Sequence, residues 1–246
     1  MIEFDIVGKH YRLSKDDRIS DIYLFGSYAR NEQDDYSDID ILIVVDTCTE
    51  VVYQELKRKI SDELEMPMEW ISLYQKDKID EMQKKGSYFL WHIKLEGIKL
   101  FSKEGFIEDI LKRLPEYSGT KEDLEDYSII CKDILNSLED KYLDITYELS
   151  VLASIIRNTA IAIDFLYGKK VFGRMTSVET CNNLLKGRME IPIQEYAKLY
   201  ENRLYENQKI GYAPKMTITD VRIWIKRAEK LLFYAKEACL YERKHE

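Results

Sequence analysis

The spacing of hydrophobic residues in the first hundred positions changes repeatedly between the period of a strand and that of a helix. Short runs rich in β-branched residues indicate strands, and Asp38–Val45 is the richest of them. Between residues 50 and 65, apolar side chains recur every four positions, as in an amphipathic helix that packs on a sheet. The predicted strands are 21–25, 38–45, 68–73 and 98–101, and the predicted helices are 50–65 and 77–95. We therefore expect an α/β (α+β) domain with a small mixed sheet.

From about Ile107 onward the pattern is helical almost throughout. Residues 121–143 have one apolar face, whereas residues 147–167 are apolar on nearly all sides, which predicts a helix at the centre of a bundle. Further helices are expected up to about Leu240. Connections of ordinary length favour an all-α, up-and-down bundle of four or five helices.

The two patterns predict two domains, residues 1–105 and residues 106–246. A chain of 246 residues is long enough to form both. The boundary is expected at Lys103–Gly105, with the segment Pro115–Gly119 as the alternative.

Composition and charge exclude several classes of protein. The chain is 45 % hydrophobic and 33 % charged, so it can bury a core. It has no apolar run near the roughly 20 residues of a membrane span and no signal-peptide pattern at its start, so we expect a cytoplasmic protein without a membrane partner. Four scattered cysteines and three histidines argue against a zinc site or a disulfide framework. The net charge of −8, most of it in residues 1–105, argues against nucleic acid as a partner.

Candidate chemistry lies at the junction of the first two predicted strands. Gly26-Ser27 follows the first strand, and ten residues later the second begins with Asp38-Ile39-Asp40. Residues two apart on a strand face the same side, so the two aspartates would present their carboxylates together. Such ligands suit Mg²⁺, which binds through one or two carboxylates plus substrate phosphates. Gly26 would let a phosphate approach the backbone, the Ser27 hydroxyl would hold it, and Arg30 would offer a charge partner.

Two of the candidate residues also have ordinary structural explanations. Glu69, in the third predicted strand, is placed to supply a third carboxylate, but a lone strand glutamate often faces only solvent. Arg30 either contacts phosphate or pairs with the acidic residues at 32–35. His92, between two apolar neighbours, is interpreted as structural.

In the helical half, Arg157 and Asn158 interrupt the most apolar helix. A buried guanidinium is costly unless it is paired, so we expect an ion pair with Glu148 or Asp164. The alternative is a contact with nucleotide or acceptor.

The segments Leu24–Arg30 and Ser37–Val44 together resemble the signature of the polymerase-β-like nucleotidyltransferase superfamily, which is Gly-Ser, ten residues, then Asp-x-Asp. The resemblance implies that the aspartates bind metal and that Gly-Ser contacts the triphosphate. Asn31 stands where the superfamily usually has glycine. The candidate site therefore consists of the metal-binding and catalytic residues Asp38, Asp40 and Glu69 and the nucleotide-binding residues Gly26, Ser27, Arg30 and Ser37.

The resemblance implies an enzyme that uses Mg²⁺, with Mn²⁺ as an alternative, to transfer a nucleoside monophosphate to a hydroxyl. We expect AMP from ATP, with other nucleoside triphosphates open. The layout is similar to that of bacterial antibiotic nucleotidyltransferases, which places an aminoglycoside-like small molecule first among acceptors. The alternative is a minimal nucleotidyltransferase of the antitoxin type that modifies a protein tyrosine or binds a partner protein. Residues 106–246 would bind the acceptor or, by analogy, form a homodimer.

Overall fold

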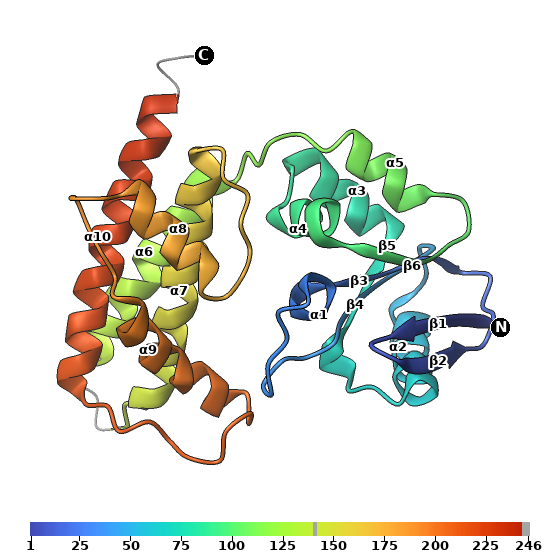
Figure 1. Cartoon of the computed structure of the whole chain (residues 1–246), viewed down its shortest axis with the longest axis horizontal. Helices are drawn as coiled ribbons and strands as arrows, with labels where there is room; N and C mark the ends of the chain where they lie inside the picture. Colours follow the sequence, from blue (N-terminus) through green and yellow to red (C-terminus); the bar gives the residue numbers. More distant parts are fainter. Residues whose placement is uncertain (140–141, 243–246) are drawn as a thin grey trace. The chain divides into compact units, whose positions relative to one another are not determined.

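The computed structural model describes residues 1–139 and 142–242, which belong to two compact units that divide between Ser118 and Gly119 (Figure 1). In the described part of the chain, the first unit contains the strands and the second contains helices only. The predicted fold class, a mixed sheet with helices followed by an all-α region, is confirmed.

The first unit is built on a four-stranded sheet in the order β5-β4-β3-β6. β3 (Ile19–Phe25) pairs antiparallel with both β4 (Asp40–Val45) and β6 (Ile98–Ser102). β4 pairs parallel with β5 (Ile71–Gln75), so the sheet is mixed. Residues 41–45 of β4 are completely buried because the strand is interior and both of its faces are covered. For the same reason its sequence is a continuous apolar run rather than an alternating one.

Different elements cover the two faces of this sheet. A hairpin, β1 (Ile2–Ile6) and β2 (Lys9–Leu13), and helix α2 (Glu50–Leu64) share one hydrophobic core with alternate residues of β4. The helices on the other face, visible in Figure 1, are α3 (Lys76–Lys85), α4 (Tyr88–Glu96) and α5 (Phe106–Lys112).

The β1–β2 hairpin was not expected from the sequence, although a short alternating pattern is present. Ile2, Phe4 and Ile6 are buried, and the residues between them are exposed. Val7 and Gly8 both have positive φ, 46° and 78°, which is the backbone of a tight two-residue hairpin turn.

The predicted helix at 77–95 is two helices, α3 and α4. Gly86 ends the first with φ +69°, a conformation that only glycine adopts without strain. Ser87 begins the second, because its hydroxyl accepts a hydrogen bond from the Phe89 N–H at 3.2 Å.

The predicted boundary after residue 105 is too early. α5 packs against α3, α4 and β3 of the first unit. The segment that follows is tied to the same unit, since Trp91 Nε1 donates to Pro115 O at 3.0 Å and Ser118 N donates to Lys85 O at 3.0 Å. The observed division falls within Pro115–Gly119, the alternative boundary.

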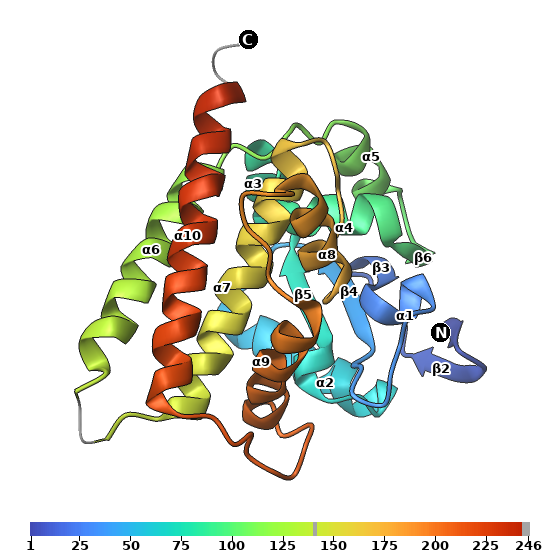
Figure 2. The ribbon, with the colours of Figure 1, turned by 60° about the vertical axis from the view of Figure 1, so that its left-hand side comes forward.

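The helices of the second unit, within its described residues, are α6 (Thr120–Ser137), α7 (Ile145–Leu166), α8 (Thr176–Leu184), α9 (Ile193–Glu206) and α10 (Ile218–Glu242). They form a bundle centred on α7, as its apolar sequence predicts. α7 packs against α8, α9 and α10, and α10 also runs beside α6 (Figure 2). Gly168, with φ +72°, follows α7 and lets the Lys169 N–H close the helix on Asp164 O at 2.7 Å.

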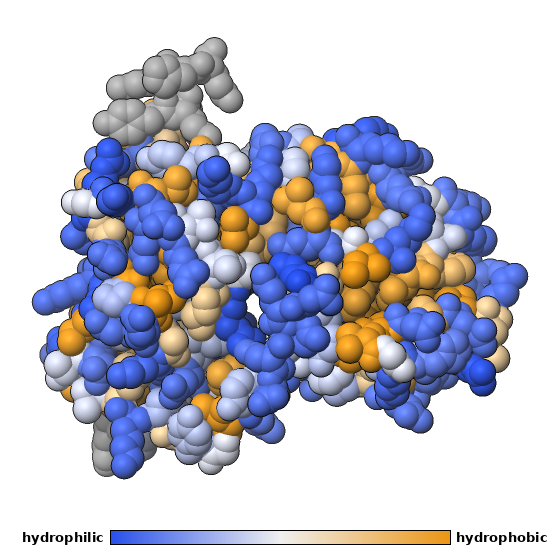
Figure 3. Space-filling model, viewed as in Figure 1, coloured by the Kyte–Doolittle hydropathy of each residue, from blue (hydrophilic) through white to orange (hydrophobic). Residues whose placement is uncertain are grey.

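Among the described residues, α7 is the one helix long and apolar enough to cross a membrane. Most of that apolar stretch is buried inside the protein, as in the core helix of a bundle. The space-filling view in Figure 3 shows hydrophilic residues interspersed with small apolar patches over the helical unit rather than a continuous apolar band.

Asp164 of α7 is fully buried, and neither of its carboxylate oxygens has a hydrogen-bond partner in the described part of the chain. Burial raises the pKa of this carboxyl from 3.8 to about 8. The folded protein therefore keeps the proton between about pH 4 and pH 8, whereas the unfolded chain releases it. The contribution of protonated Asp164 to the free energy of unfolding is therefore complete below about pH 4 and is lost as the pH rises from about 4 to about 8.

We therefore expect the free energy of unfolding of the helical unit to fall by about 1.4 kcal/mol per pH unit between pH 5 and pH 7.5. Asp164→Asn should abolish most of this slope and make the protein more stable than wild type at pH 8. Urea unfolding at several pH values, followed through hydrogen exchange of α7 amides, measures both effects. Asp133→Asn, at an exposed position of α6, is the control and should leave the slope unchanged.

Candidate functional site

The end of β3 and the start of β4 place a glycine against a carboxylate. Phe25 pairs with Asp40 in the antiparallel register. Directly after Phe25 the chain turns at Gly26, with φ +74°, into the one-turn helix α1 (Gly26–Arg30). A Cβ added to residue 26 would lie only 2.1 Å from Asp40 Oδ2. The Asp40 carboxylate thus occupies the space that any side chain at position 26 would need.

Asp38 lies two residues before Asp40 but outside β4, in the loop after α1. The prediction that the strand begins at Asp38 is wrong by two residues, so strand alternation does not orient its carboxylate. Both aspartates are half-buried. The structure brings Asp40 and Gly26 together, whereas Asp38 lies in the loop that leads into β4.

The two serines of the candidate site lie in different surroundings. Ser27 is half-buried in the first turn of α1, and its carbonyl accepts a hydrogen bond from the Glu32 N–H at 2.9 Å. The Ser37 hydroxyl donates to Asp34 Oδ1 at 2.8 Å and accepts from the Asp34 N–H at 3.0 Å. Ser37 therefore shapes the loop that leads to Asp38.

Glu69 is not in the centre of a strand, and that prediction is wrong. It lies in η1 (Met68–Trp70), a single 3₁₀ turn closed by the Trp70 N–H on Pro67 O at 3.1 Å, and β5 begins only at Ile71. Its side chain is exposed. In the described part of the chain, no three Asp, Glu, His or Cys side chains lie close enough to hold one metal ion, so Glu69 does not form a three-carboxylate cluster with the aspartates.

The Arg30 side chain points to α4, where it pairs with Glu96, and it also pairs with Glu32. His92 contacts the same Glu96, in agreement with its structural interpretation. Sequence reasoning considered Glu32 as a partner of Arg30 but missed Glu96. The available signal was the spacing of His92 and Glu96, four residues apart on one helix face.

In the second unit, the expected pairing of Arg157 with Asp164 is not found, since the Asp164 oxygens accept no hydrogen bond from the described residues. Arg157 Nη2 donates instead to the carbonyl of Phe172 at 2.7 Å. Glu148 accepts a long hydrogen bond from the Ser137 hydroxyl at 3.4 Å. Arg157 thus ties α7 to the loop before α8.

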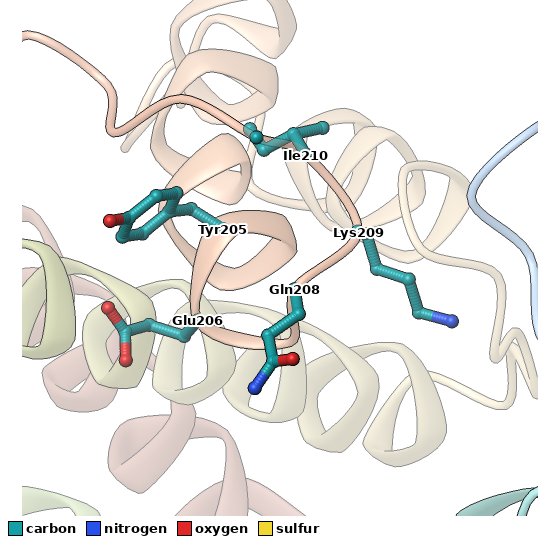
Figure 4. A pocket seen from close by; sticks show the side chains of 6 residues that line it. Tyr205, Glu206, Gln208, Lys209 and Ile210 are labelled. Atoms are coloured by element: carbon teal, nitrogen blue, oxygen red, sulfur yellow. The ribbon is translucent and has the colours of Figure 1, made fainter.

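Two open hollows lie away from the aspartates. One, of about 370 Å³, follows the end of β5 and includes Tyr53, Tyr74 and Gln75. The other, of about 430 Å³, surrounds the end of α9 (Figure 4). In the close-up, the side chains of Tyr205, Gln208 and Lys209 point in different directions. None of the candidate site residues lines either hollow.

Comparison with known proteins connects the first unit to one family. A model described as Polymerase beta, Nucleotidyltransferase matches residues 10–105. A putative protein adenylyltransferase of Methanocaldococcus jannaschii is 43 % identical over 60 residues, which make up 24 % of this chain and 61 % of that relative. A second one from the same organism is 40 % identical over 70 residues, or 28 % of this chain and 71 % of the relative. The chain thus spans less than two thirds of the first relative's length.

Among solved structures, spectinomycin adenyltransferase AAD(9) from Enterococcus faecialis, with ATP and spectinomycin, is similar over 88 % of this chain and 92 % of its own. Its sequence identity is 13 % and its TM-score 0.49. These values are too low to say what the present chain binds.

Proposed function

Because the chain belongs to the polymerase-β nucleotidyltransferase family, we propose that it transfers AMP from ATP to a hydroxyl group of an acceptor. The observation that carries this proposal is the contact between Gly26 and Asp40. It places a carboxylate at a turn where the backbone has no side chain to keep a phosphate away.

Asp38 and Asp40 are the residues that would hold Mg²⁺, with Mn²⁺ as an alternative. Their donor set fits this ion, because Mg²⁺ is usually bound by one or two carboxylates and completes its coordination with substrate phosphates and water. No third protein ligand is needed. The ion would neutralise charge on the transferred phosphoryl group.

The remaining roles fall to residues of the same unit. Gly26 would let a phosphate approach the backbone, and the amide and hydroxyl of Ser27 would donate hydrogen bonds to its oxygens. Ser37 would act on the nucleotide only indirectly, through the loop that presents Asp38. Glu69 would accept the proton of the acceptor hydroxyl, a role supported by its exposure just before β5.

We expect Glu69→Gln to lower kcat by about a hundredfold, because general-base catalysis contributes on this order. Its KM for ATP should stay near the wild-type value, since Glu69 would touch the acceptor rather than the triphosphate. Glu65→Gln, at another exposed position four residues away, serves as the control and should retain full activity. A large rise in KM for ATP in Glu69→Gln would contradict the proposed role.

For the acceptor, we propose a hydroxyl side chain of a protein, tyrosine above all. The support is that the two relatives at 40 and 43 % identity are both described as putative protein adenylyltransferases. The second candidate is a cationic, hydroxylated small molecule of the aminoglycoside kind. It is favoured by the acidic excess of residues 1–105, which hold 22 acidic and 15 basic residues.

Mass spectrometry of small molecules and intact proteins tests the donor and both acceptors. The pure chain is incubated with Mg²⁺ and each nucleoside triphosphate, alone, with an aminoglycoside and lincosamide panel, and with proteins from a host extract. We expect an AMP adduct on a protein, formed with ATP and abolished by EDTA. An adduct on a drug would establish the second candidate, and no adduct or pyrophosphate release under any condition would refute the transferase proposal.

A further inference from the structure

Arg30, the last residue of α1, is held by two carboxylates. Its Nε donates to Glu32 Oε2 at 2.7 Å, and its Nη1 donates to Glu96 Oε2 of α4 at 2.6 Å. The Arg30 and Glu96 side chains are only 18 % and 14 % exposed, whereas Glu32 is 51 % exposed. A shielded ion pair is weakened less by water and salt than an exposed one, so the contact with Glu96 is the stronger of the two.

Both members of this shielded pair stay charged. Burial alone would raise the pKa of Glu96, but the hydrogen bonds and charges of His92 and Arg30 outweigh burial and lower it. For Arg30, burial alone would lower the pKa, and the bonds to Glu32 and Glu96 raise it instead. Arg30 and Glu96 therefore each stay ionised because an oppositely charged group lies beside them.

His92 supports the same carboxylate. Its Nε2 lies 2.7 Å from Glu96 Oε2 and 3.3 Å from Arg30 Nη1. A carboxylate only accepts hydrogen bonds, so the shorter contact requires a proton on Nε2, which donates to Glu96. Nε2 then has no lone pair for Arg30. The Glu96 oxygen thus receives one hydrogen bond from α1 and one from its own helix.

The other end of α1 contacts rings of the same helix. The Phe25 ring meets Phe89 at 5.3 Å and His92 at 5.4 Å, with interplanar angles of 87° and 86°. Edge-to-face contacts of this kind are favourable. α4 therefore holds both the residue before α1 and the last residue of α1, and Gly26 and Ser27 lie between these two contacts.

We propose that Arg30 is a positioning residue that anchors α1 to α4 through Glu96 and so holds Gly26 and Ser27 beside Asp40, and that it is not a phosphate ligand. A single helical turn is unstable by itself in water, so its position must come from contacts with neighbouring elements. The importance of that position rests on the proposed function of Gly26 and Ser27.

Glu96→Gln in the full chain separates the two roles of Arg30, because it keeps the size of the side chain and removes its charge. If Arg30 is an anchor, hydrogen exchange should become about tenfold faster at the Asn31 and Glu32 amides, which donate to the α1 carbonyls of Tyr28 and Ser27. The value of kcat should also fall about tenfold, the effect of weakening one charged hydrogen bond. The KM for ATP should change less than kcat. A phosphate-binding Arg30 would instead be released, so a lower KM for ATP with unchanged exchange would overturn the proposal.

Charge exchange gives the second test. Arg30→Glu alone should speed exchange and slow turnover, and the double variant Arg30→Glu/Glu96→Arg should recover most of both. Failure of the double variant to recover either quantity, together with wild-type behaviour of Glu96→Gln, would refute the anchor. Glu32→Gln, which changes the exposed partner, is the matched control and should stay within about twofold of wild type.

The exchange measurement does not depend on turnover, so the two proposals fail separately. Faster exchange in Glu96→Gln, with no transfer by the wild-type chain, would leave the anchor standing and remove the transferase proposal. Transfer by the wild-type chain, with unchanged exchange in Glu96→Gln, would do the reverse.

Discussion

Asp40→Asn should lower the rate of AMP transfer about a thousandfold, while the protein remains folded. The substitution keeps the shape of the side chain and removes the negative charge that would hold Mg²⁺. A catalytic metal supplies several kcal/mol of transition-state stabilisation, and about 4 kcal/mol corresponds to a factor of a thousand. Asp40 is half-buried at the start of β4, and asparagine can keep its place beside Gly26. Initial rates at saturating ATP and Mg²⁺, with circular dichroism and a melting curve, measure both parts of the expectation.

The loop before β4 offers a matched control for this substitution. Asp35→Asn removes the same charge from an exposed position three residues before Asp38. Asp35→Asn should leave the rate of AMP transfer nearly unchanged. A large loss of rate in both variants would mean that the net negative charge of the loop matters rather than the Asp40 carboxylate itself. A tenth or more of wild-type activity in Asp40→Asn would contradict the metal-binding role.

The parts of the fold that sequence reasoning identified correctly are those where burial alone sets the pattern. β4 reads as an unbroken apolar run because both of its faces are covered. α7 is apolar on nearly all sides because helices of its own bundle surround it. The spacing between Gly26 and Asp40 also predicted correctly that the two residues lie close together. In two antiparallel strands joined by a loop, the end of the first strand lies beside the start of the second.

Elements whose structure depends on distant contacts were missed or misplaced. The sequence of α5, a short helix, does not show which unit it belongs to, and only its packing against α3, α4 and β3 assigns it to the first. Glu96, the shielded partner of Arg30, lies 66 residues away in the sequence. The local spacing of His92 and Glu96 draws attention to Glu96 but does not show that it pairs with Arg30. Glu69 was misplaced because the apolar residues around it suit a strand, while the backbone after Pro67 makes a 3₁₀ turn first.

Gly26→Ala is the sharpest test of the contact that carries the proposed function. The new Cβ would lie 2.1 Å from Oδ2, 3.0 Å from Cγ and 3.2 Å from Cβ of Asp40, so the carboxylate must move. A displacement of about 1 Å at a reacting centre can cost a hundredfold in rate, and we expect a loss of that size. Gly8→Ala is the matched control, because Gly8 has φ +78° and nothing within 4 Å of its added Cβ. Both variants should lose about 1–2 kcal/mol of unfolding free energy to backbone strain. Gly26→Ala should lose more than Gly8→Ala because of the clash with Asp40, and only Gly26→Ala should lose activity.

A double-mutant cycle separates the strain at position 26 from the clash with Asp40. In Gly26→Ala/Asp40→Ala the carboxylate is absent, so the free energy of unfolding should return towards that of Gly8→Ala, whereas transfer should remain abolished. The interaction energy between the two substitutions then measures the contact directly, because the residues touch and their separate effects should not add. Two results would contradict the importance of this contact: additive effects of the two substitutions on the free energy of unfolding, or wild-type transfer by Gly26→Ala. Either result would mean that the Asp40 carboxylate can move away from Gly26 at no cost, and that their close approach does not bring the triphosphate to the aspartates.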